Sequence, residues 1–334
     1  MRFLVAGGAG FMGSNFVRYL VSRQPDAEIL VYDKFTYAGR RENLLGLDES
    51  RVRVVRGDIC DAETLERVFT EFEPEVVVNF AAETHVDRSI REPLSFVKTN
   101  VEGVAVLLET VRRREAELFV HISTDEVYGD VGDGEPVDES APLRPSSPYS
   151  ASKAGGDLLC QAYWRTYGLP VRTVRPSNNY GPYQYPEKLI PKALLRALMG
   201  LPVPVYGDGS QRRDWLFVED FCRGLHVVIE KGVNGEVYNM PGFNEKTNLD
   251  VVRDVLRLLG KPESLIAFVP DRPGHDRRYA MRGDKILALG WRPVVPWEEG
   301  LRRTVEWYIS NDWWWRPLLS DSFFASDTPW GGSR

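Results

Sequence analysis

The chain has 334 residues, of which 43% are hydrophobic and 27% charged, and its formal net charge is −6. These values are typical of a globular protein with one large domain or two moderate ones. The acidic balance, without any block of Lys and Arg, argues against nucleic-acid binding. No apolar run approaches the length of a membrane span, and glycines interrupt the first run too early for a signal peptide.

The three cysteines, Cys60, Cys160 and Cys222, stand far apart without a CxxC spacing. This pattern is typical of free thiols in a reducing compartment, so we expect a cytoplasmic protein. The four histidines show no HExxH motif or other metal-ligand spacing, and we expect no metal site.

Short apolar runs alternate with segments of helical periodicity through the first half of the chain. We expect strands near residues 2–6, 28–32, 52–56, 75–80, 118–122 and 170–175, and helices near 11–23, 61–72, 95–114 and 148–167. This alternation is typical of βαβ units whose parallel sheet is covered on both faces. The predicted fold class is α/β, with a Rossmann-like doubly wound parallel sheet.

After Arg175 prolines become frequent, and shorter helices are expected near 186–199, 219–231, 248–260 and 298–310. We expect one domain over 1–175, rejoined by parts of 208–240 and 291–310, and a smaller, loop-rich C-terminal domain over 176–334. Loops on a rigid scaffold commonly select the ligand, so the second domain is expected to bind substrate. The tail from Asn311 carries three consecutive tryptophans, which we expect to pack on the body or on a partner subunit.

The glycines at positions 7, 8, 10 and 13 follow the first expected strand and open the first expected helix. Such glycines allow a tight turn and let main-chain N–H groups approach a pyrophosphate at the helix N-terminus. Asp33 ends the second expected strand, 20 residues past Gly13, where a carboxylate can accept hydrogen bonds from a ribose. A carboxylate there repels a 2′-phosphate, so the sequence predicts NAD rather than NADP in the first domain.

Tyr149 and Lys153 lie four residues apart, hence on one face of a helix. We expect the Lys153 ammonium, together with a positive nicotinamide, to favour the Tyr149 phenolate. Lowering a tyrosine pKa by about three units requires roughly 4 kcal/mol. This pair is the chemistry that alcohol oxidation by NAD requires.

Thr124, Asp125 and Glu126 follow the expected strand 118–122 at the edge where open α/β sheets bind ligands. Two crowded carboxylates cannot ionise equally, so one is expected to act as an acid and the other as a base. Alcohol oxidation alone does not require them. The extra acid and base therefore indicate an elimination reaction.

The chain closely resembles the dTDP-glucose 4,6-dehydratases, a family of extended short-chain dehydrogenase/reductases. The matching segments are GGAGFMGSN, YDKFTYAG, NFAAETHVDRSI, ISTDEVYG, SPYSASKAG, SNNYGPYQYPEKLIP, YGDGSQRRDW, VEDFCRG, YNMPGFNEKTNLDVV and DRPGHDRRYA. The resemblance implies a lyase that converts dTDP-glucose to dTDP-4-keto-6-deoxy-glucose for deoxysugar biosynthesis, such as that of rhamnose.

The resemblance also implies a role for each catalytic residue. Tyr149 takes the C4 hydroxyl proton while hydride passes to NAD, Lys153 holds the phenolate and the nicotinamide ribose, and Thr124 hydrogen-bonds the C4 oxygen. Glu126 then removes the C5 proton, Asp125 protonates the departing C6 hydroxyl, and the hydride returns to C6.

The residues that the resemblance assigns to the cofactor are Gly7, Gly10, Phe11, Met12, Gly13, Asp33, Lys34, Phe35, Thr36, Asp58, Ile59, Phe80, Ala81, Ala82, Thr99, Tyr149, Lys153 and Asn179. Those assigned to the nucleotide sugar are Thr84, Thr124, Asn178, Lys188, Leu189, Pro204, Val205, Tyr206, Arg213, Asn248, Asp271, Arg272, Pro273, Gly274 and His275. The chemistry agrees in part, since planar arginines suit a diphosphate. The family pairs its subunits through helices matching 95–114 and 148–167, which implies a homodimer.

Three alternatives stay open at this stage. A UDP-glucose 4,6-dehydratase differs in its preferred base by one methyl group, which contributes only about 1–3 kcal/mol in a pocket. A nucleotide-sugar 4-epimerase shares the cofactor and the Tyr–Lys pair but has no use for the carboxylates. A catalytically silent NAD-binding regulator on the same fold has no use for the Tyr–Lys pair or for the carboxylates.

Overall fold

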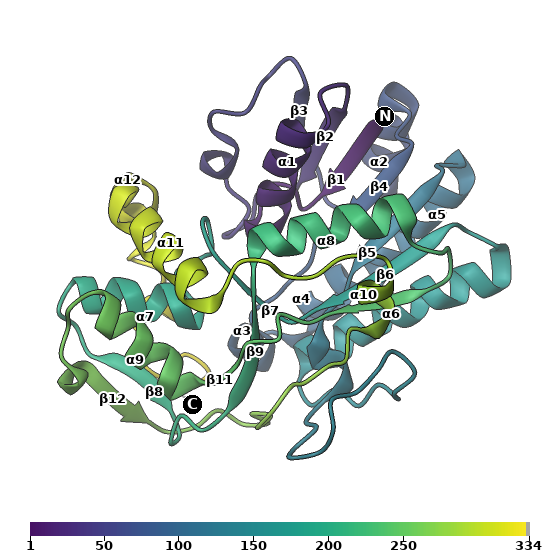
Figure 1. Ribbon diagram of the computed structural model, residues 1–334. Coiled ribbons are helices and arrows are strands. Elements are labelled where there is room, and N and C mark those ends of the chain that lie inside the picture. Colours follow the sequence, from purple (N-terminus) through teal and green to yellow (C-terminus); the bar gives the residue numbers. More distant parts are fainter. Residues whose placement is uncertain (332–334) are drawn as a thin grey trace.

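A seven-stranded sheet forms the centre of the computed structural model, which describes residues 1–331 (Figure 1). The strands all run parallel, in the order β10-β6-β5-β4-β1-β2-β3. Their bounds are β1 (Arg2–Ala6), β2 (Glu28–Asp33), β3 (Val52–Arg56), β4 (Val76–Asn79), β5 (Leu118–Ile122), β6 (Val171–Pro176) and β10 (Val237–Met240). The predicted doubly wound parallel sheet and its six N-terminal strands are confirmed.

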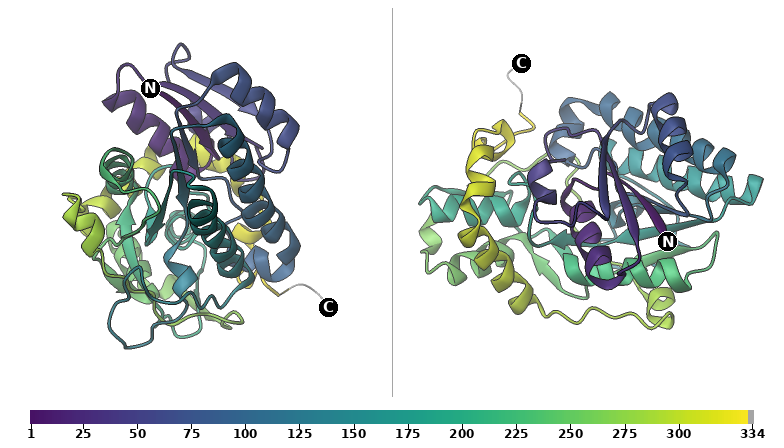
Figure 2. Two further views of the ribbon diagram at one scale, coloured as in Figure 1. Left: turned by 90° about the vertical axis from the view of Figure 1, so that its right-hand side faces the viewer. Right: turned by 90° about the horizontal axis from the view of Figure 1, so that it is seen from above.

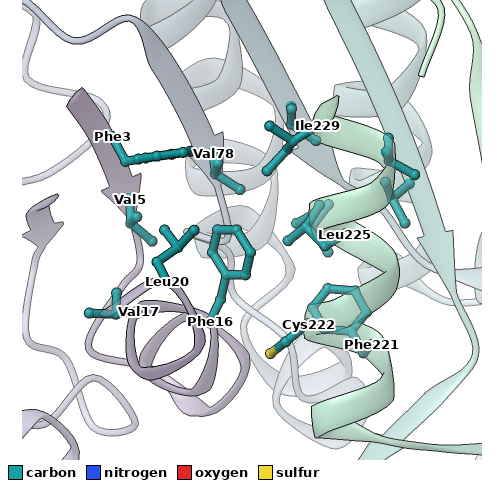
Figure 3. Close-up of a cluster of buried hydrophobic side chains, with 14 of the residues drawn as sticks. Phe3, Val5, Phe16, Val17, Leu20, Val78, Phe221, Cys222, Leu225 and Ile229 are labelled. Carbon is teal, nitrogen blue, oxygen red and sulfur yellow. The ribbon is translucent and has the colours of Figure 1, made fainter. Parts of the chain in front are cut away.

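Helices cover both faces of this sheet. On one face lie α1 (Phe11–Arg23) and α8 (Val218–Lys231), and on the other lie α2 (Ala62–Phe72), α5 (Val104–Arg114) and α6 (Pro148–Tyr167). Figure 3 shows Phe16 and Leu20 of α1 facing Phe221 and Leu225 of α8 across the first face. Each such side chain contributes roughly 1.5–3 kcal/mol on burial. A helix from the second half of the chain thus completes the core of the first half.

The helix expected near 95–114 differs in detail from the prediction. It comprises α4 (Pro93–Val97), a π-helical segment η2 (Lys98–Gly103) and α5. The wider turn holds the buried Asn100, whose side chain accepts from the N–H of Glu83 and donates to Ser152 Oγ. Single π turns inside α-helices are frequent at functional sites, and their hydrogen-bond pattern has no simple sequence signature.

A second lobe packs beside the carboxyl edge of the sheet (Figure 1). Its helices are α7 (Leu189–Leu198), α9 (Asn248–Leu258) and α11 (Trp297–Ser310), close to the predicted positions. Its strands are β7 (Asn178–Tyr180), β9 (Arg212–Phe217) and β11 (Glu245–Thr247) in one small sheet, and β8 (Val203–Tyr206) and β12 (Ile266–Val269) in another. These strands were not predicted, because four of them have only three or four residues, and the six residues of β9 do not alternate between apolar and polar.

Short helices complete the fold: α3 (Val86–Arg91), α10 (Asp284–Ala288), α12 (Asp312–Trp315), α13 (Ser322–Ala325), η1 (Arg41–Leu44), η3 (Asp125–Tyr128), η4 (Glu263–Leu265) and η5 (Arg316–Leu318). The C-terminal tail from Asn311 packs on the body of the chain, which is one of the two arrangements that we expected. The fully buried Trp314 donates from Nε1 to Asn43 Oδ1 at 2.7 Å, and its carbonyl accepts from Arg40 at 2.9 Å. Figure 2 shows the yellow C-terminal helices beside the purple loop that follows β2.

Candidate active site

Two adjoining cavities of about 280 Å³ and about 150 Å³ form one cleft between the sheet and the second lobe. The first extends from the carboxyl ends of β1 and β4, where the strand order reverses, and this switch point is where open α/β sheets bind ligands. Both cavities are lined by Thr84, Glu126, Asn178, Glu187 and Lys188. A ligand longer than either cavity can therefore span both.

The glycine turn forms one wall of the first cavity. Gly7 has φ +73°, and a Cβ there would lie 2.5 Å from the main-chain nitrogen of Ala81. A Cβ on Gly13 would clash with the carbonyl oxygen of Gly7 and lie 2.8 Å from Gly8 Cα. The first turn of α1 carries no acidic residue, so its free N–H groups can face an anion. This cradle fits the pyrophosphate of a dinucleotide.

Asp33 lies at the end of β2 in the same cavity, with its carboxylate fixed by the main chain. Oδ2 accepts from the N–H of Ala9 at 2.9 Å and Oδ1 from the N–H of Phe35 at 2.8 Å. Burial raises its pKa, and the two N–H donors oppose this rise. Each oxygen keeps further acceptor capacity for the vicinal hydroxyls of a ribose.

The other predicted cofactor residues line this cavity with one exception. Phe35 lines neither cavity, and its contact with the cofactor stays a prediction. It adopts φ 55°, its ring packs with the core, and the guanidinium of Arg41 lies 5.2 Å from the ring centroid. Its N–H holds Asp33. Lys34 lies in the cavity wall with its Nζ 2.7 Å from Asp58 Oδ2.

Tyr149 and Lys153 project into the first cavity from α6, which begins with a capping box formed by Ser147 and Ser150. Lys153 is buried and donates from Nζ to the carbonyl oxygen of Ile122 at 2.6 Å. This bond fixes α6 against the end of β5, immediately before the carboxylate pair. Burial lowers the pKa of Lys153 to about 8, against the opposing effect of the Asp157 carboxylate.

The protein's own groups raise the pKa of Tyr149, whereas the lower pKa expected from the sequence was for the site with a positive nicotinamide beside the phenol. Burial is the largest cause, and the Glu126 carboxylate adds to it. The sequence expectation considered the nearby cations and omitted both the desolvation of the phenol and its anionic neighbours. The protein's own groups thus hold Tyr149 as a neutral phenol.

Asp125 and Glu126 begin η3 directly after β5, with Thr124 as the helix cap. Burial, followed by repulsion from Glu126, raises the pKa of Asp125 well above its ordinary value. Burial also raises the pKa of Glu126, but Arg272 and Arg213 oppose that rise. Asp125 Oδ2 is buried and has no hydrogen-bond partner among the described residues. The pair therefore suits Asp125 as the proton donor and Glu126 as the acceptor.

The second cavity holds the polar groups suited to a nucleotide. Tyr206 donates to Asp87 Oδ2 at 3.1 Å, and Arg272 Nη1 lies 3.1 Å from Asp87 Oδ1. Arg213 donates to main-chain carbonyls, with its guanidinium 4.2 Å from the centroid of the Tyr279 ring. The predicted residues that line this cavity are Thr84, Asn178, Lys188, Leu189, Pro204, Val205, Tyr206, Arg213, Asn248, Arg272 and His275. Thr124 lines the first cavity instead.

Three predicted substrate residues line neither cavity: Asp271, Pro273 and Gly274. Gly274 has φ +65° and turns the loop, so that Arg272 and His275 enter the cavity while their neighbours do not. Asp271 lies behind them, with Oδ1 2.6 Å from Nδ1 of His275 and Oδ2 accepting from Gln211. We correct Asp271 from a lining residue to a residue that orients His275.

Several site residues were missed by the sequence analysis, although all of them except Lys192 lie in segments that it singled out. Glu187 lines both cavities, Tyr37 lines the first, and His85, Asp87 and Lys192 line the second. The available signal was a polar side chain in a matched segment, within a few residues of one that the resemblance assigned to the site. Within residues 1–331 we find no set of three His, Cys, Asp or Glu side chains arranged for a metal ion, and no helix long and apolar enough to cross a bilayer.

Comparison with known proteins gives a consistent set of relatives. Residues 4–304 match the family model described as GDP-mannose 4,6 dehydratase. A dTDP-glucose 4,6-dehydratase of Neisseria meningitidis is 50% identical, covering 96% of this chain and 97% of that protein. The dTDP-glucose 4,6-dehydratase 1 of Escherichia coli is 49% identical, and the match covers 94% of this chain and 94% of that protein.

Solved structures agree with these relatives. DesIV, a dTDP-glucose 4,6-dehydratase from Streptomyces venezuelae with NAD and TYD bound, has a TM-score of 0.93 and 48% identity, covering 95% of this chain and 100% of that one. The UDP-glucose 4-epimerase of Thermus thermophilus, in complex with NAD, has a TM-score of 0.87 and 36% identity, covering 93% of this chain and 100% of that one. The fold is thus shared with epimerases, and the site has to distinguish the two activities.

Proposed function

The chain belongs to the dTDP-glucose 4,6-dehydratase family, and from this premise we propose that it converts dTDP-glucose to dTDP-4-keto-6-deoxy-glucose with bound NAD. The observation that carries the proposal is the buried pair Asp125 and Glu126, whose pKa values are raised to different extents beside Tyr149. Epimerisation at C4 has no use for an acid and a base at C5 and C6. This pair favours dehydration over the epimerase alternative.

When bound, NAD accepts a hydride from C4 of the hexose and later returns it to C6. The glycine turn and Asp33 would hold the cofactor, with its pyrophosphate at the N-terminus of α1. Tyr149 accepts the proton of the C4 hydroxyl, assisted by the buried Lys153 ammonium and the Thr124 hydroxyl at the same wall. The raised pKa of the free phenol makes it dependent on a further positive charge in the site to act as a base.

The 4-ketone acidifies the C5 proton, which the Glu126 carboxylate removes. The protonated Asp125 carboxyl delivers its proton to the departing C6 hydroxyl, which leaves as water. Arg213 and Arg272 bind the diphosphate, and Tyr206 lies against the base. Glu187, at the junction of the two cavities, is placed to accept hydrogen bonds from the hexose hydroxyls.

Incubation with dTDP-glucose in deuterated water tests the proposal. We expect a 4-keto-6-deoxy sugar with deuterium at C5, because Glu126 exchanges its proton with solvent before returning it. Absence of both product and label would contradict dehydration. Turnover of UDP-glucose in a parallel reaction measures the preference for the base, and we expect dTDP-glucose to be used with the higher kcat/KM.

Glu126→Gln tests the assignment of the base. We expect this variant to form reduced cofactor from dTDP-glucose, seen by its absorbance, while product and C5 exchange fall by at least about 100-fold. Full turnover by the variant would assign the base to another residue.

We also propose a homodimer paired through α4, α5 and α6. Large apolar side chains on these helices are exposed in the single chain, including Leu94 at 81%, Leu158 at 52% and Tyr167 at 55%. An exposed apolar patch of this kind is typical of an interface.

We place the enzyme in the cytoplasm, a proposal supported by its three free cysteines.

A further inference from the structure

The C-terminal tail is connected to the cleft through a chain of charged groups. Asp321 Oδ2 accepts from Arg88 Nη2 at 2.9 Å, and Arg88 Nε donates to Glu187 Oε2 at 2.8 Å. The other oxygen of Glu187 accepts from the Tyr37 hydroxyl at 3.0 Å. Glu187 is 1% exposed and lines both cavities, so the tail reaches the junction of the cleft through a single intervening side chain.

Arg88 is held rigidly between these two carboxylates. Its guanidinium carbon lies 3.8 Å from the centroid of the Tyr37 ring and 3.9 Å from that of Phe323, which belongs to the tail. A planar guanidinium between two rings can donate to carboxylates on different edges, which a lysine cannot do. The geometry of Glu187 therefore depends on the position of the tail.

The tail itself is fixed to the wall of the second cavity. Lys192, which lines that cavity, donates from Nζ to the carbonyl oxygens of Phe323 at 2.8 Å and Ser326 at 2.6 Å. Arg196 Nη2 lies 2.9 Å from Asp327 Oδ1. These bonds place Asp321 and Phe323 at defined positions beside Arg88 rather than on a loose terminus.

The position of Glu187 within the cleft defines what it can contact. In a substrate that spans both cavities, C4 of the hexose has to reach Tyr149 in the first and the diphosphate has to reach Arg272 in the second. The hexose therefore lies at the junction, beside Glu187. A carboxylate fixed there can accept hydrogen bonds from two neighbouring hydroxyls.

We propose that Asp321 is a positioning residue for the hexose: through Arg88 it orients the Glu187 carboxylate at the junction of the two cavities. This inference rests on the proposed function. It assigns to the Asp321 carboxylate an effect on the sugar half of the ligand and none on the nucleotide half, and this difference can be measured.

Asp321→Asn is the variant of choice, because Asp321 Oδ1 also caps α13 by accepting from the N–H of Phe323 at 2.8 Å. Asparagine keeps a capping oxygen and removes the negative charge that Arg88 contacts. Asp312→Asn is the matched control, since Asp312 lies in the same tail and pairs with Arg316 at 2.8 Å on the surface.

Calorimetric titration of the NAD-loaded protein with dTDP-glucose and with dTDP alone separates the two halves of the ligand, with Tyr149→Phe present in every titrated protein so that the sugar is bound but not converted. KM is measured with Tyr149 intact. For Asp321→Asn we expect the Kd of dTDP-glucose to rise by roughly three- to tenfold, with an equal rise in KM, and the Kd of dTDP to stay unchanged. The Asp312→Asn control is expected to match the wild type in both titrations. Equal weakening of both ligands, or no change in either, would overturn the inference.

Arg88→Lys provides a second test, because lysine keeps the charge but cannot bridge the two carboxylates. If Asp321 acts through Arg88, the double variant binds dTDP-glucose no more weakly than Arg88→Lys alone. Independent, multiplicative losses would contradict the proposed connection. Failure of the wild-type protein to convert dTDP-glucose would contradict the proposed function, whereas normal binding by Asp321→Asn in an active enzyme would overturn this inference alone.

Discussion

Asp157 of α6 and Arg175 of β6 form a buried, two-pronged ion pair behind the catalytic helix. Arg175 Nε donates to Asp157 Oδ2 at 2.8 Å and Nη2 donates to Oδ1 at 2.9 Å, and the side chains are 2% and 0% exposed, respectively. Asp157 follows Lys153 by one helical turn, and its negative charge opposes the lowering of that lysine's pKa by burial. The pair therefore fixes α6 on the sheet and supports the charged state of Lys153.

Asp157→Asn is expected to lower the free energy of unfolding by about 3–5 kcal/mol, because it leaves the Arg175 guanidinium buried without a counter-charge. Thermal and urea unfolding measure this loss. Glu299→Gln, which disrupts an exposed pair with Arg302, is the matched control and is expected to leave the free energy of unfolding almost unchanged. Equal effects of the two substitutions would contradict the importance of burial.

The same ion pair predicts a pH dependence of stability. Burial acts to raise the pKa of Asp157, but the hydrogen bonds and the positive charge of Arg175, with the hydrogen bonds of Gln161 and Ser123, together outweigh this, and the folded-state pKa is lowered. A lowered carboxyl pKa contributes stability at pH values above the unfolded pKa, and this contribution is lost as the pH falls through the folded pKa. The stability difference between wild type and Asp157→Asn is thus expected to shrink on acidification, as measured by urea unfolding across acidic pH.

Gly13→Ala is expected to abolish retention of NAD. The added Cβ would clash with the carbonyl oxygen of Gly7 and force the turn to open. Cofactor released from the purified, denatured protein measures retention by absorbance. Gly331→Ala is the control, because its Cβ would meet only ordinary contacts with Thr328. Normal NAD content in Gly13→Ala would show that the turn tolerates a methyl group and does not approach the cofactor closely.

In the dependence of kcat on pH, the acidic limb is expected to reflect the ionisation of the Glu126 carboxylate. The base has to be ionised, so turnover falls as the pH decreases through its pKa, which burial raises above the ordinary value. Arg272 opposes that rise, so Arg272→Met should move the acidic limb to higher pH at saturating substrate, besides raising KM. An unchanged limb in this variant would assign the ionisation to another group.

Leu158→Glu tests the proposed dimer. A charge at this exposed position of α6 is expected to dissociate the protein into monomers at micromolar concentration, as measured by sedimentation velocity. Val294→Glu is the control, because Val294 is also exposed, at 66%, but lies outside these helices. A wild-type protein that sediments as a monomer would overturn the proposed assembly.

The sequence by itself determined the sheet and the core of the chemistry. The period of the apolar residues identified six of the seven central strands, and the glycines, Asp33, Tyr149 and Lys153 identified the cofactor half of the site. These features are local, since a strand, a turn and a helical i,i+4 pair are encoded within a few residues. The position of Asp125 and Glu126 after a central strand identified the acid–base pair, and the segments matching the dehydratases added the role of each carboxylate.

Only the tertiary structure decided how distant segments meet. The Asp321–Arg88–Glu187 connection joins three segments that are far apart in the sequence, and no local pattern encodes such a contact. The same holds for β10, which joins the sheet from the second half of the chain, and for Phe35, which adopts φ 55° and packs its ring against the core. The direction of the Tyr149 pKa shift also required the fold, because desolvation depends on everything that surrounds a group and not on its neighbours in the chain.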